Sequence, residues 1–525
     1  MKHEWLQYLP AHIRPQAEAE VAELDFLKAK TRVLEELLRL RRLERYGRRS
    51  ESLTEEQLLL LSEEPTVSSQ ELALEANLAA QEKRASKPAT PGGSPRRKHP
   101  GRQPLPAHLP RQEQVIPCPP DQCACPICHQ PTVVIGHDTS EELGVKPVEY
   151  FVRVIRREKR ACRQHPEGGV ATAPVPAKLL PKSKLSDEVI IDTVIRKYEW
   201  HQPLYRQAAM LAREAAVVID RHTLDDGVMW VGQLLLPLKP PMRQELFIGR
   251  YLQADETPVG VKTPRVRGRS HRAYLFEYSQ PYGVAVFDFR MGRGREGPRE
   301  FLDGFAGTLQ CDGYAGYDDL APPGSPAAQA ICRAGCLAHC RRYFDKAHEV
   351  APTETAALGV VRQIGALYAV EALAREQGMT AAERLTLRQQ QSVGLMAALK
   401  AQIEKLQKTA LPKSALGRAC GYALGQWARL EVFLHDGHIE IDNNRCENGM
   451  RPVALGRKNW LLIGSEAAGP KVAAILSVLE TCRRLKIDAR AYLKDVLPRL
   501  AQWPLPEVAE LTPRAWQQRQ PPKTA

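Results

Sequence analysis

The sequence Tyr-Leu-Gln-Ala-Asp at positions 251–255 ends an apolar run on a carboxylate, and Gly-Thr-Leu-Gln-Cys-Asp at 307–312 does the same. Both runs are typical of buried strands, and we predict that they end side by side in one sheet. A strand-end aspartate taken alone is usually a turn residue. Here a third carboxylate, Glu447, follows in a polar, asparagine-rich helical stretch. Asp255, Asp312 and Glu447 together are what a two-magnesium phosphodiester site requires, because Mg²⁺ prefers oxygen ligands.

The elements expected around these aspartates define a fold. We predict strands near 246–254, 272–278, 283–290, 307–312 and 328–333, with a helix near 296–305. Three antiparallel strands, a helix and further strands are the element order of a ribonuclease-H-like α/β core. Residues 345–436 are rich in Ala, Leu, Gln and Arg, which predicts a helical insertion between Asp312 and Glu447. We expect Pro452 to bend or end the helix that carries Glu447.

The predicted fold class is multidomain α+β, and shifts in composition mark its parts. They are an N-terminal helical segment 1–83, a basic Pro/Gly-rich linker 84–111, a zinc-binding module 112–175, a helical DNA-binding region 183–236, the catalytic domain 244–470, a helical segment 471–502 and a tail 503–525. We expect the tail to be disordered because it is terminal and contains several prolines.

Two helical regions leave alternatives open. Positions 24, 27, 31, 34 and 38 fit a short heptad seam, so the first segment is either a dimer zipper or an amphipathic hairpin on its own domain. Helices near Leu204–Glu214 and Asp220–Trp230 are spaced like a helix-turn-helix, but their turn at 215–217 lacks a glycine. An ordinary helical hairpin fits the same pattern.

The bulk composition favours a polyanionic partner. The 525 residues carry a net charge of +13, and basic side chains that neutralise phosphates gain affinity by releasing counterions. Arg96, Arg97 and Arg102 in the linker are candidates for DNA contact, and a solvated basic linker is the competing interpretation. The first ten residues lack a signal-peptide core, and charged residues interrupt the apolar stretch 358–374. We therefore expect no membrane segment and a cytoplasmic, nucleoid-associated protein.

Cysteines between residues 118 and 128 predict one structural Zn²⁺. Cys125 and Cys128 form a C-x-x-C pair, and Cys162 and His165 form a C-x-x-H pair further on. Tetrahedral zinc takes four Cys or His ligands, which two such pairs supply. The cysteine at 118 or the one at 123 could replace Cys125, and this alternative stays open.

Several segments, in one order, resemble the insertion-sequence-66 transposases, a family within the DDE transposase and retroviral-integrase superfamily. The matching segments are Arg45–Leu53, Leu105–Arg111, Ala254–Pro258, Cys311–Tyr317, Cys336–Phe344, Asp442–Pro452 and Gly456–Trp460. His165 departs from the family, where a cysteine is more usual. The resemblance implies a bacterial DNA-cutting and strand-joining enzyme in which Asp255, Asp312 and Glu447 are catalytic and hold two Mg²⁺, or Mn²⁺ in their place.

The resemblance also implies contacts and partners. The candidate DNA contacts are His339, Arg342, Arg451, Arg457 and Lys458, and a core histidine is the competing interpretation of His339. The implied partners are double-stranded DNA (the element's terminal inverted repeats and its target), further copies of the chain, and small accessory proteins of the same element. Two rival functions are a hydrolysis-only nuclease of the same fold and a catalytically inactive, transposase-derived DNA-binding protein. The presence of all three carboxylates argues against the inactive protein.

Overall fold

The computed structural model describes residues 185–263, 270–318, 320, 331–502 and 505–520, with short pieces before them that include 150–152, 159–161, 170–172 and 178–180. The chain divides into two compact units, one of Met1–Arg84 with Pro174–Ala525 and the other of Ala85–Ala173. In the second unit, β1 (Lys159–Ala161) pairs antiparallel with β2 (Val170–Thr172). Several predictions lie outside the described residues, namely most of segment 1–83, the linker arginines Arg96, Arg97 and Arg102, and the zinc ligands Cys125, Cys128, Cys162 and His165.

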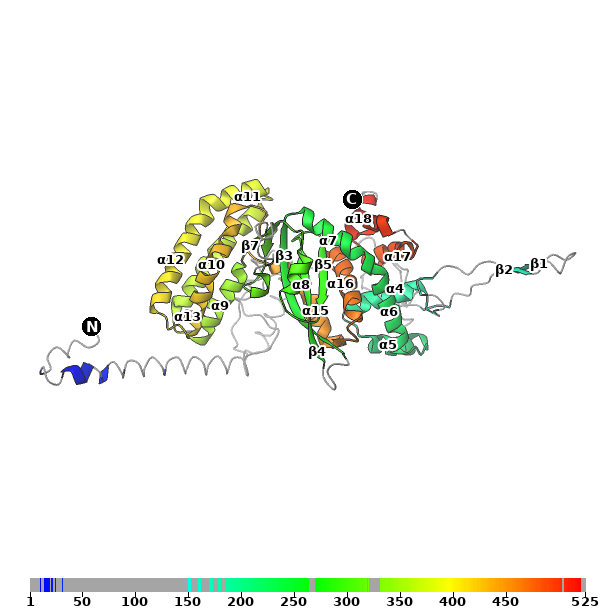
Figure 1. Ribbon diagram of the computed structural model, residues 1–525, viewed down its shortest axis with the longest axis horizontal. Helices are drawn as coiled ribbons and strands as arrows, with labels where there is room; N and C mark the ends of the chain where they lie inside the picture. The colour runs from blue at the N-terminus through cyan, green and yellow to red at the C-terminus, as the bar shows by residue number, and fades with distance from the viewer. Residues whose placement is uncertain are drawn as a thin grey trace, which may run out of the picture. The chain divides into compact units, whose positions relative to one another are not determined.

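A six-stranded sheet lies at the centre of the first unit (Figure 1). Its strands are β3 (Tyr251–Val261), β4 (His271–Ser279), β5 (Ala285–Arg290), β6 (Gly307–Gln310), β7 (Ile331–Ala334) and β8 (Leu462–Ile463). Their order is β5-β4-β3-β6-β7, and β8 pairs with the far end of β3. The first three strands are antiparallel, whereas β6 runs parallel to β3 and β7 runs parallel to β6.

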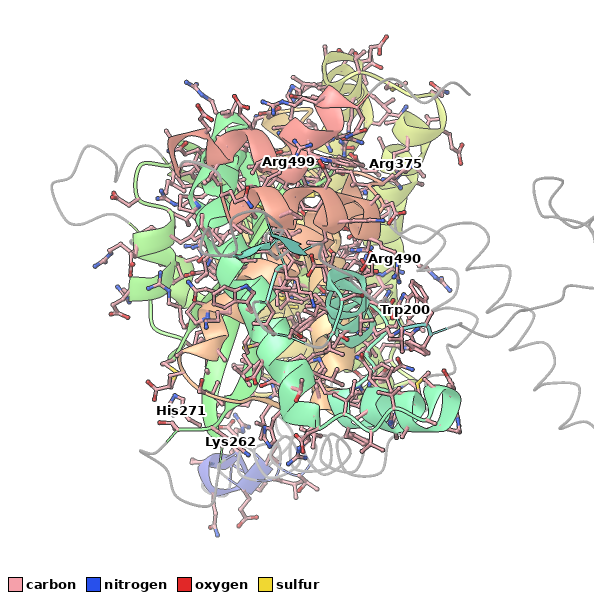
Figure 2. The ribbon with its side chains drawn as sticks, turned by 90° about the vertical axis from the view of Figure 1, so that its right-hand side faces the viewer. Trp200, Lys262, His271, Arg375, Arg490 and Arg499 are labelled. Atoms are coloured by element: carbon pink, nitrogen blue, oxygen red, sulfur yellow. The ribbon has the colours of Figure 1, made fainter. Side chains whose placement is uncertain are left out.

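Each predicted strand overlaps an observed one, and the mixed helix-and-sheet class is confirmed. Two details of the prediction are wrong. Residues 246–248 belong to helix α7 (Lys239–Ile248), because Met242 and Leu246 are buried at helical spacing. Asp255 lies inside β3 and not at its end, because β4 pairs with β3 as far as Val261, well beyond the short parallel contact with β6. Figure 2 shows Lys262 and His271 at the same end of the β3–β4 pair.

Helices from both ends of the first unit pack on the β5 side of the sheet (Figure 1). They are α4 (Asp187–Tyr198), α5 (Leu204–Ala215), α6 (Arg221–Leu235), the 3-10 helix η4 (Leu236–Leu238), α7, α16 (Ala468–Arg484), α17 (Ala489–Leu500), the 3-10 helix η9 (Leu505–Leu511) and α18 (Pro513–Arg519). Helix α16 is buried along most of its length against β5 and α6. Its Ser477 hydroxyl accepts a hydrogen bond from the Phe287 amide at 2.8 Å, so the helix also satisfies an edge of the sheet.

The predicted helix-turn-helix pair is present as α5 and α6. The turn between them places Ala216 in the left-handed region, with φ of 53°. A glycine is the usual residue there, and an alanine adopts this conformation at a cost of about 1–2 kcal/mol. The missing glycine therefore does not prevent the turn, and the DNA-reading role of the pair stays a prediction.

The C-terminal tail is folded over residues 505–520, contrary to the predicted disorder. Leu511 is buried, and the Tyr492 hydroxyl donates to its carbonyl oxygen at 2.6 Å. The Trp516 ring packs edge-on against Tyr492, and its Nε1 donates to Asp495 at 2.8 Å. Pro513 occupies the first turn of α18, where a proline costs no hydrogen bond. Aromatic burial therefore outweighs the proline content that suggested disorder.

The chain between β7 and residue 436 is helical, as predicted for 345–436, and lies on the β7 side of the sheet (Figure 1). Its elements are α9 (Leu337–Val350), α10 (Thr355–Glu376), α11 (Ala381–Leu387), the π-helix η7 (Arg388–Ser392), α12 (Val393–Thr409), α13 (Ala415–Gly425), α14 (Trp427–Leu430) and the 3-10 helix η8 (Val432–His435). Helices α9, α10, α12, α13, α14 and η8 share one hydrophobic core, in which Phe344, Ile364 and Leu399 are fully buried, and Leu387 of α11 packs with Val370 and Ala374 of α10. We call these helices the helical block.

Helix α10 is, among the described residues, the one helix long and apolar enough to cross a membrane by length and composition. It packs against α9, α11 and α12. Glu371, near its end, is buried and forms ion pairs with Arg384 and Arg388. These are the contacts of a core helix, because a buried charge needs such partners.

Helix α15 (Asn444–Trp460) carries Glu447 and continues past Pro452, so of the two predicted effects of the proline, the ending of the helix is wrong. A proline inside a helix costs about 3 kcal/mol or more. The buried residues Met450, Val453 and Gly456 hold the helix against β3, β4 and α4 on both sides of the proline. This packing outweighs the lost hydrogen bond. The remaining short elements are α8 (Glu296–Phe301) and the 3-10 helix η5 (Ala315–Tyr317).

Candidate active site

The two aspartates lie near each other in two neighbouring parallel segments, Asp255 within β3 and Asp312 two residues after the end of β6. The register pairs Gln253 of β3 with Gln310 of β6. Asp255 and Asp312 each lie two residues beyond those glutamines, and side chains two residues apart share one face of a strand. The sheet therefore brings Asp255 and Asp312 together, as the sequence predicted. The Asp312 carboxylate also accepts a hydrogen bond from the Tyr314 amide at 2.9 Å, which fixes the turn after β6.

Glu447 joins them because the start of α15 is bonded to the backbone and side chains around Asp255. The Gln253 side chain donates to the Asp442 carbonyl at 2.8 Å and accepts from the Cys446 amide at 3.3 Å. Asn443 donates to the Ala254 carbonyl at 3.4 Å. Glu447 lies in the first turn of α15, next to Cys446. A residue 135 positions from Asp312 thus reaches the same site through contacts with β3.

The pKa of Asp255 reflects the negative charges that lie close to it. Burial raises the pKa of Asp255 well above its ordinary value, and the negative charges of Glu447, Glu256 and Asp312 raise it further. Like charges at short range disfavour a second ionised carboxylate unless a cation balances them. A divalent cation held by Asp255, Asp312 and Glu447 would balance these charges with the oxygen ligands that such ions prefer.

Two cationic or ionisable groups from α9 contact Glu447. Arg342 Nη2 donates to both carboxylate oxygens, at 2.8 and 2.7 Å. His339 Nδ1 lies 3.3 Å from Glu447 Oε1, in a geometry that does not make a hydrogen bond. Burial lowers the pKa of His339, although Glu447 opposes that shift, so the imidazole is neutral near pH 7. His339 and Arg342 thus lie beside the carboxylate cluster, and their contact with DNA stays a prediction.

Glu256 follows Asp255 in β3 and points to the opposite face of the strand, so it does not join the cluster. Arg293 Nε donates to its carboxylate at 3.0 Å, and the Tyr317 hydroxyl donates at 2.9 Å. Burial raises the pKa of Glu256, and the hydrogen bond from Arg293 lowers it. The Glu256 charge is therefore balanced by the protein itself and does not need a metal ion.

A known protein family matches the region that contains the sheet and the carboxylates Asp255, Asp312 and Glu447. A family model described as "Transposase IS66 family" matches residues 182–471, more than half of the chain. The chain belongs to the IS66 transposase family. Models described as "Transposase C of IS166 homeodomain" and "zinc-finger binding domain of transposase IS66" match residues 33–113 and 122–164 of this chain. The resemblance found in the sequence is thereby confirmed.

Three uncharacterized proteins of Sinorhizobium fredii (strain NBRC 101917 / NGR234) are similar to the transposase over most of its length. Protein y4qI is 34% identical over 520 residues, covering 95% of this chain and 92% of the relative. Protein y4hP is 30% identical over 440 residues, with coverage of 80% and 78%. Protein y4jD is 33% identical over 409 residues, with coverage of 75% and 78%. The similarity to y4qI therefore extends well beyond the residues that the transposase model matches.

The remaining predicted DNA contacts of the transposase differ in their surroundings. Arg451 and Lys458 are exposed on α15. Arg457 instead donates to the Thr257 hydroxyl at 2.8 Å and the Pro258 carbonyl at 2.7 Å, so it fastens α15 to β3. Its contact with DNA stays a prediction, and any such contact has to share a guanidinium that is already bonded.

Sequence reasoning missed a buried polar network that positions the segment before Glu447. Gln253 Nε2 donates to Gln310 Oε1 at 2.9 Å, and Gln310 Nε2 donates to the Glu440 carbonyl at 2.7 Å. The Tyr251 hydroxyl accepts from the Glu440 amide at 3.0 Å. A signal was available: each glutamine stands inside an otherwise apolar strand, and a buried amide has to find partners.

The helical block adds a second set of contacts to the same segment. The Tyr368 hydroxyl of α10 donates to Asp442 Oδ2 at 2.7 Å, while Asp442 Oδ1 accepts from the Asn444 amide at 3.0 Å. Arg384 bonds Glu440 through both terminal nitrogens, at 3.2 and 2.6 Å. The start of α15 is thus held between the sheet and the helical block, which no local pattern in the sequence could reveal.

Proposed function

We propose that this chain is a DDE-type DNA transposase that binds the ends of an insertion sequence and carries out metal-dependent DNA cleavage and strand transfer. The observation that carries the proposal is the convergence of Asp255, Asp312 and Glu447 from β3, the end of β6 and α15, together with the raised pKa of Asp255. Membership of the IS66 transposase family supports the same activity.

The donor set suits two Mg²⁺ ions, or Mn²⁺ in their place. Asp255, Asp312 and Glu447 offer only oxygen ligands, which hard divalent cations prefer. Cations at this place would also relieve the repulsion among the carboxylates. When bound, the ions would stabilise negative charge on the reacting phosphate and make water a stronger nucleophile.

The protein's own side chains prepare this site. Arg342 orients Glu447 through two hydrogen bonds, and it is exposed enough to turn toward a DNA phosphate. Neutral His339 adds no positive charge next to Glu447. The Arg293–Glu256 pair on the far face keeps a fourth negative charge balanced. The carboxylates left for a divalent cation are thus Asp255, Asp312 and Glu447.

We further propose that the core has the ribonuclease-H-like fold and that the chain is organised in the domains predicted from its sequence. The strand order β5-β4-β3-β6-β7, with three antiparallel strands followed by two parallel ones, supports this fold. The match to a zinc-finger model over 122–164 supports a zinc module. Cys125, Cys128, Cys162 and His165 would hold one Zn²⁺, although that match ends one residue before His165.

The proposed partners are the double-stranded DNA of the element ends and of the target, further copies of the chain and small accessory proteins, in the cytoplasm. Exposed Arg451 and Lys458 on α15, the α5–α6 helix pair and the linker arginines would contact DNA phosphates. His339 would stand at the metal site, and Arg342 would alternate between Glu447 and a phosphate.

The decisive experiment uses a donor DNA that carries the element's own ends, either intact or pre-nicked, with a target plasmid and Mg²⁺. We expect wild-type protein to cut the intact donor and to join both donors to the target. Asp255→Asn should lose both activities, because the amide cannot replace a carboxylate ligand. Asp303→Asn, in an exposed turn after α8, is the matched control and should retain them. Full cleavage by Asp255→Asn would refute the site.

The same assay separates the two rival functions. Cleavage without joined products, even from the pre-nicked donor, would identify a hydrolysis-only nuclease. Binding of the element ends without any Mg²⁺- or Mn²⁺-dependent cleavage would identify a DNA-binding protein that has lost catalysis.

A further inference from the structure

A cysteine, a histidine and a glutamate meet beside the carboxylate cluster. Cys336 Sγ, a ring nitrogen of His339 and a carboxylate oxygen of Glu447 all lie within 4.8 Å of one another. Cys336 caps the N-terminus of α9 and His339 lies in its first turn, while Glu447 comes from the first turn of α15. Two helix starts therefore bring sulfur, nitrogen and oxygen ligands to one point.

Cys336 lies at the start of α9 with its side chain buried. It occupies the N-cap of this helix of 14 residues, where the end of the helix is positive. Thiolate sulfur is the form of cysteine that binds a metal ion. Burial raises the pKa of the Cys336 thiol, so a cation would have to displace its proton.

His339 offers a nitrogen at the same point. Within the described part of the chain, its Nδ1 is buried and makes no hydrogen bond, although Glu447 Oε1 is only 3.3 Å away. A buried ring nitrogen without a hydrogen-bonding partner is uncommon and needs an explanation. A neutral imidazole with an available lone pair is the form that binds metal ions.

We propose that Cys336, His339 and Glu447 bind a thiophilic divalent cation, represented by Zn²⁺, and that this ion withdraws Glu447 from the magnesium site. The second half rests on the proposed function. Three protein ligands with an open fourth position are a common zinc arrangement, whereas Mg²⁺ disfavours sulfur and nitrogen. Ligand bonds of about 2.0–2.3 Å place ligand atoms roughly 3.3–3.8 Å apart. The cluster therefore needs to contract by only about 1 Å.

The positive charge of Arg342 opposes binding of this ion, so replacing Arg342 offers a second test of the proposal. It donates to both oxygens of Glu447, so zinc binding has to displace at least one of these hydrogen bonds. More than half of the Arg342 side chain is exposed, which allows it to turn away. Removing its positive charge with Arg342→Gln should strengthen zinc binding, whereas removing a ligand should weaken it.

The direct test is the zinc content of the full-length protein after equilibration with Zn²⁺, measured by atomic emission. Cys336→Ser should hold one zinc ion fewer per chain than wild type. Cys332→Ser, an exposed cysteine four residues earlier on β7, is the matched control and should hold as many as wild type. Unchanged zinc content in Cys336→Ser would overturn the proposal.

Two further variants keep the test informative if Cys336→Ser does not fold. His339→Gln should lose the same ion, and Arg342→Gln should bind it more tightly in a titration with Zn²⁺. If these residues had only a structural role, the two substitutions would not change the zinc affinity in opposite directions. Equal zinc affinity in both variants and wild type would overturn the proposal.

The functional half is tested by adding Zn²⁺ to the Mg²⁺-dependent cleavage assay. Zinc should inhibit wild type and Cys332→Ser alike. Cys336→Ser should need at least about tenfold more zinc for half-inhibition, the smallest loss expected when a metal site loses a partner. Equal inhibition of both variants would overturn this half. If wild type does not cleave DNA at all, the proposed function fails, while the zinc content still decides the site.

Discussion

Replacing Arg388 by methionine should open the helical block. Arg388 is completely buried at the junction of α11 and η7. Its guanidinium bonds both carboxylate oxygens of Glu371, at 2.7 and 2.9 Å. It also donates to the carbonyls of Phe433 and Asp436, at 2.7 and 2.9 Å. One side chain thus ties α10 to the segment that leads to the active site.

The magnitude follows from these contacts. Removing one partner of a buried ion pair costs about 3–5 kcal/mol. Arg384 remains 2.6 Å from Glu371 and balances part of its charge, which places the loss near the lower value. The carbonyls of Phe433 and Asp436 share one donor nitrogen, Nη1, and its loss adds about 1 kcal/mol in all. Because methionine fills most of the volume, no large cavity forms, and we expect a destabilisation of about 4 kcal/mol.

Native-state hydrogen exchange followed by mass spectrometry measures this local free energy. A loss of about 4 kcal/mol corresponds to roughly 10³-fold faster exchange in α10 and α12, since about 1.4 kcal/mol is a factor of ten. Arg418→Met, at an exposed position on α13, is the matched control and should change stability by less than about 0.5 kcal/mol. Exchange in Arg388→Met within tenfold of wild type would show that the buried pair does not hold the block together.

Other perturbations test separate parts of the molecule. Burial raises the pKa of Glu371, but Arg388 and Arg384 outweigh it and lower the pKa below 4.5. The stabilising charge of Glu371 is therefore present above about pH 4.5 and is lost as the pH falls through the lowered pKa. Melting curves followed by circular dichroism should show this loss of stability in acid for wild type and not for Glu371→Gln. A Cβ added by Gly449→Ala would overlap the Glu277 carboxylate behind α15; we expect a loss of about 2–3 kcal/mol in urea unfolding and slower cleavage, and unchanged values would mean that α15 shifts freely. Cys128→Ser should lose one zinc ion by atomic emission and weaken end binding in gel shifts, while the thermal unfolding of the catalytic unit stays as in wild type; full zinc content would contradict the ligand assignment.

The sequence predicted the parts of the site that local patterns encode. Apolar runs that stop at polar residues located the strands around Asp255 and Asp312, and asparagine-rich polarity located the helix of Glu447. It could not predict that β3 continues past Asp255, because that continuation depends on β4 pairing beyond the reach of β6.

What remained unpredictable depends on contacts between distant residues. The hydrogen bond from Tyr368 to Asp442 joins residues 74 positions apart, and the one from Gln253 to Asp442 spans 189 positions. The prediction of a disordered tail, which was based on composition, is likewise wrong. Trp516 contacts Tyr492 edge-on only in the folded chain, so composition could not reveal this contact. Tertiary packing, and not local propensity, decides such segments.

Strand β3 holds both ends of the helix that bears Glu447. Gln253 bonds the residues at its start, and β8, directly after its end, pairs with Gly260 and Val261. The distance between Asp255 and Glu447 is therefore set by β3 and by the contacts that hold both ends of α15 to this strand. The helical block adds contacts from Tyr368 and Arg384 to the segment before α15. A change in the length of its other helices that keeps these two contacts would therefore leave the distance between the carboxylates unchanged.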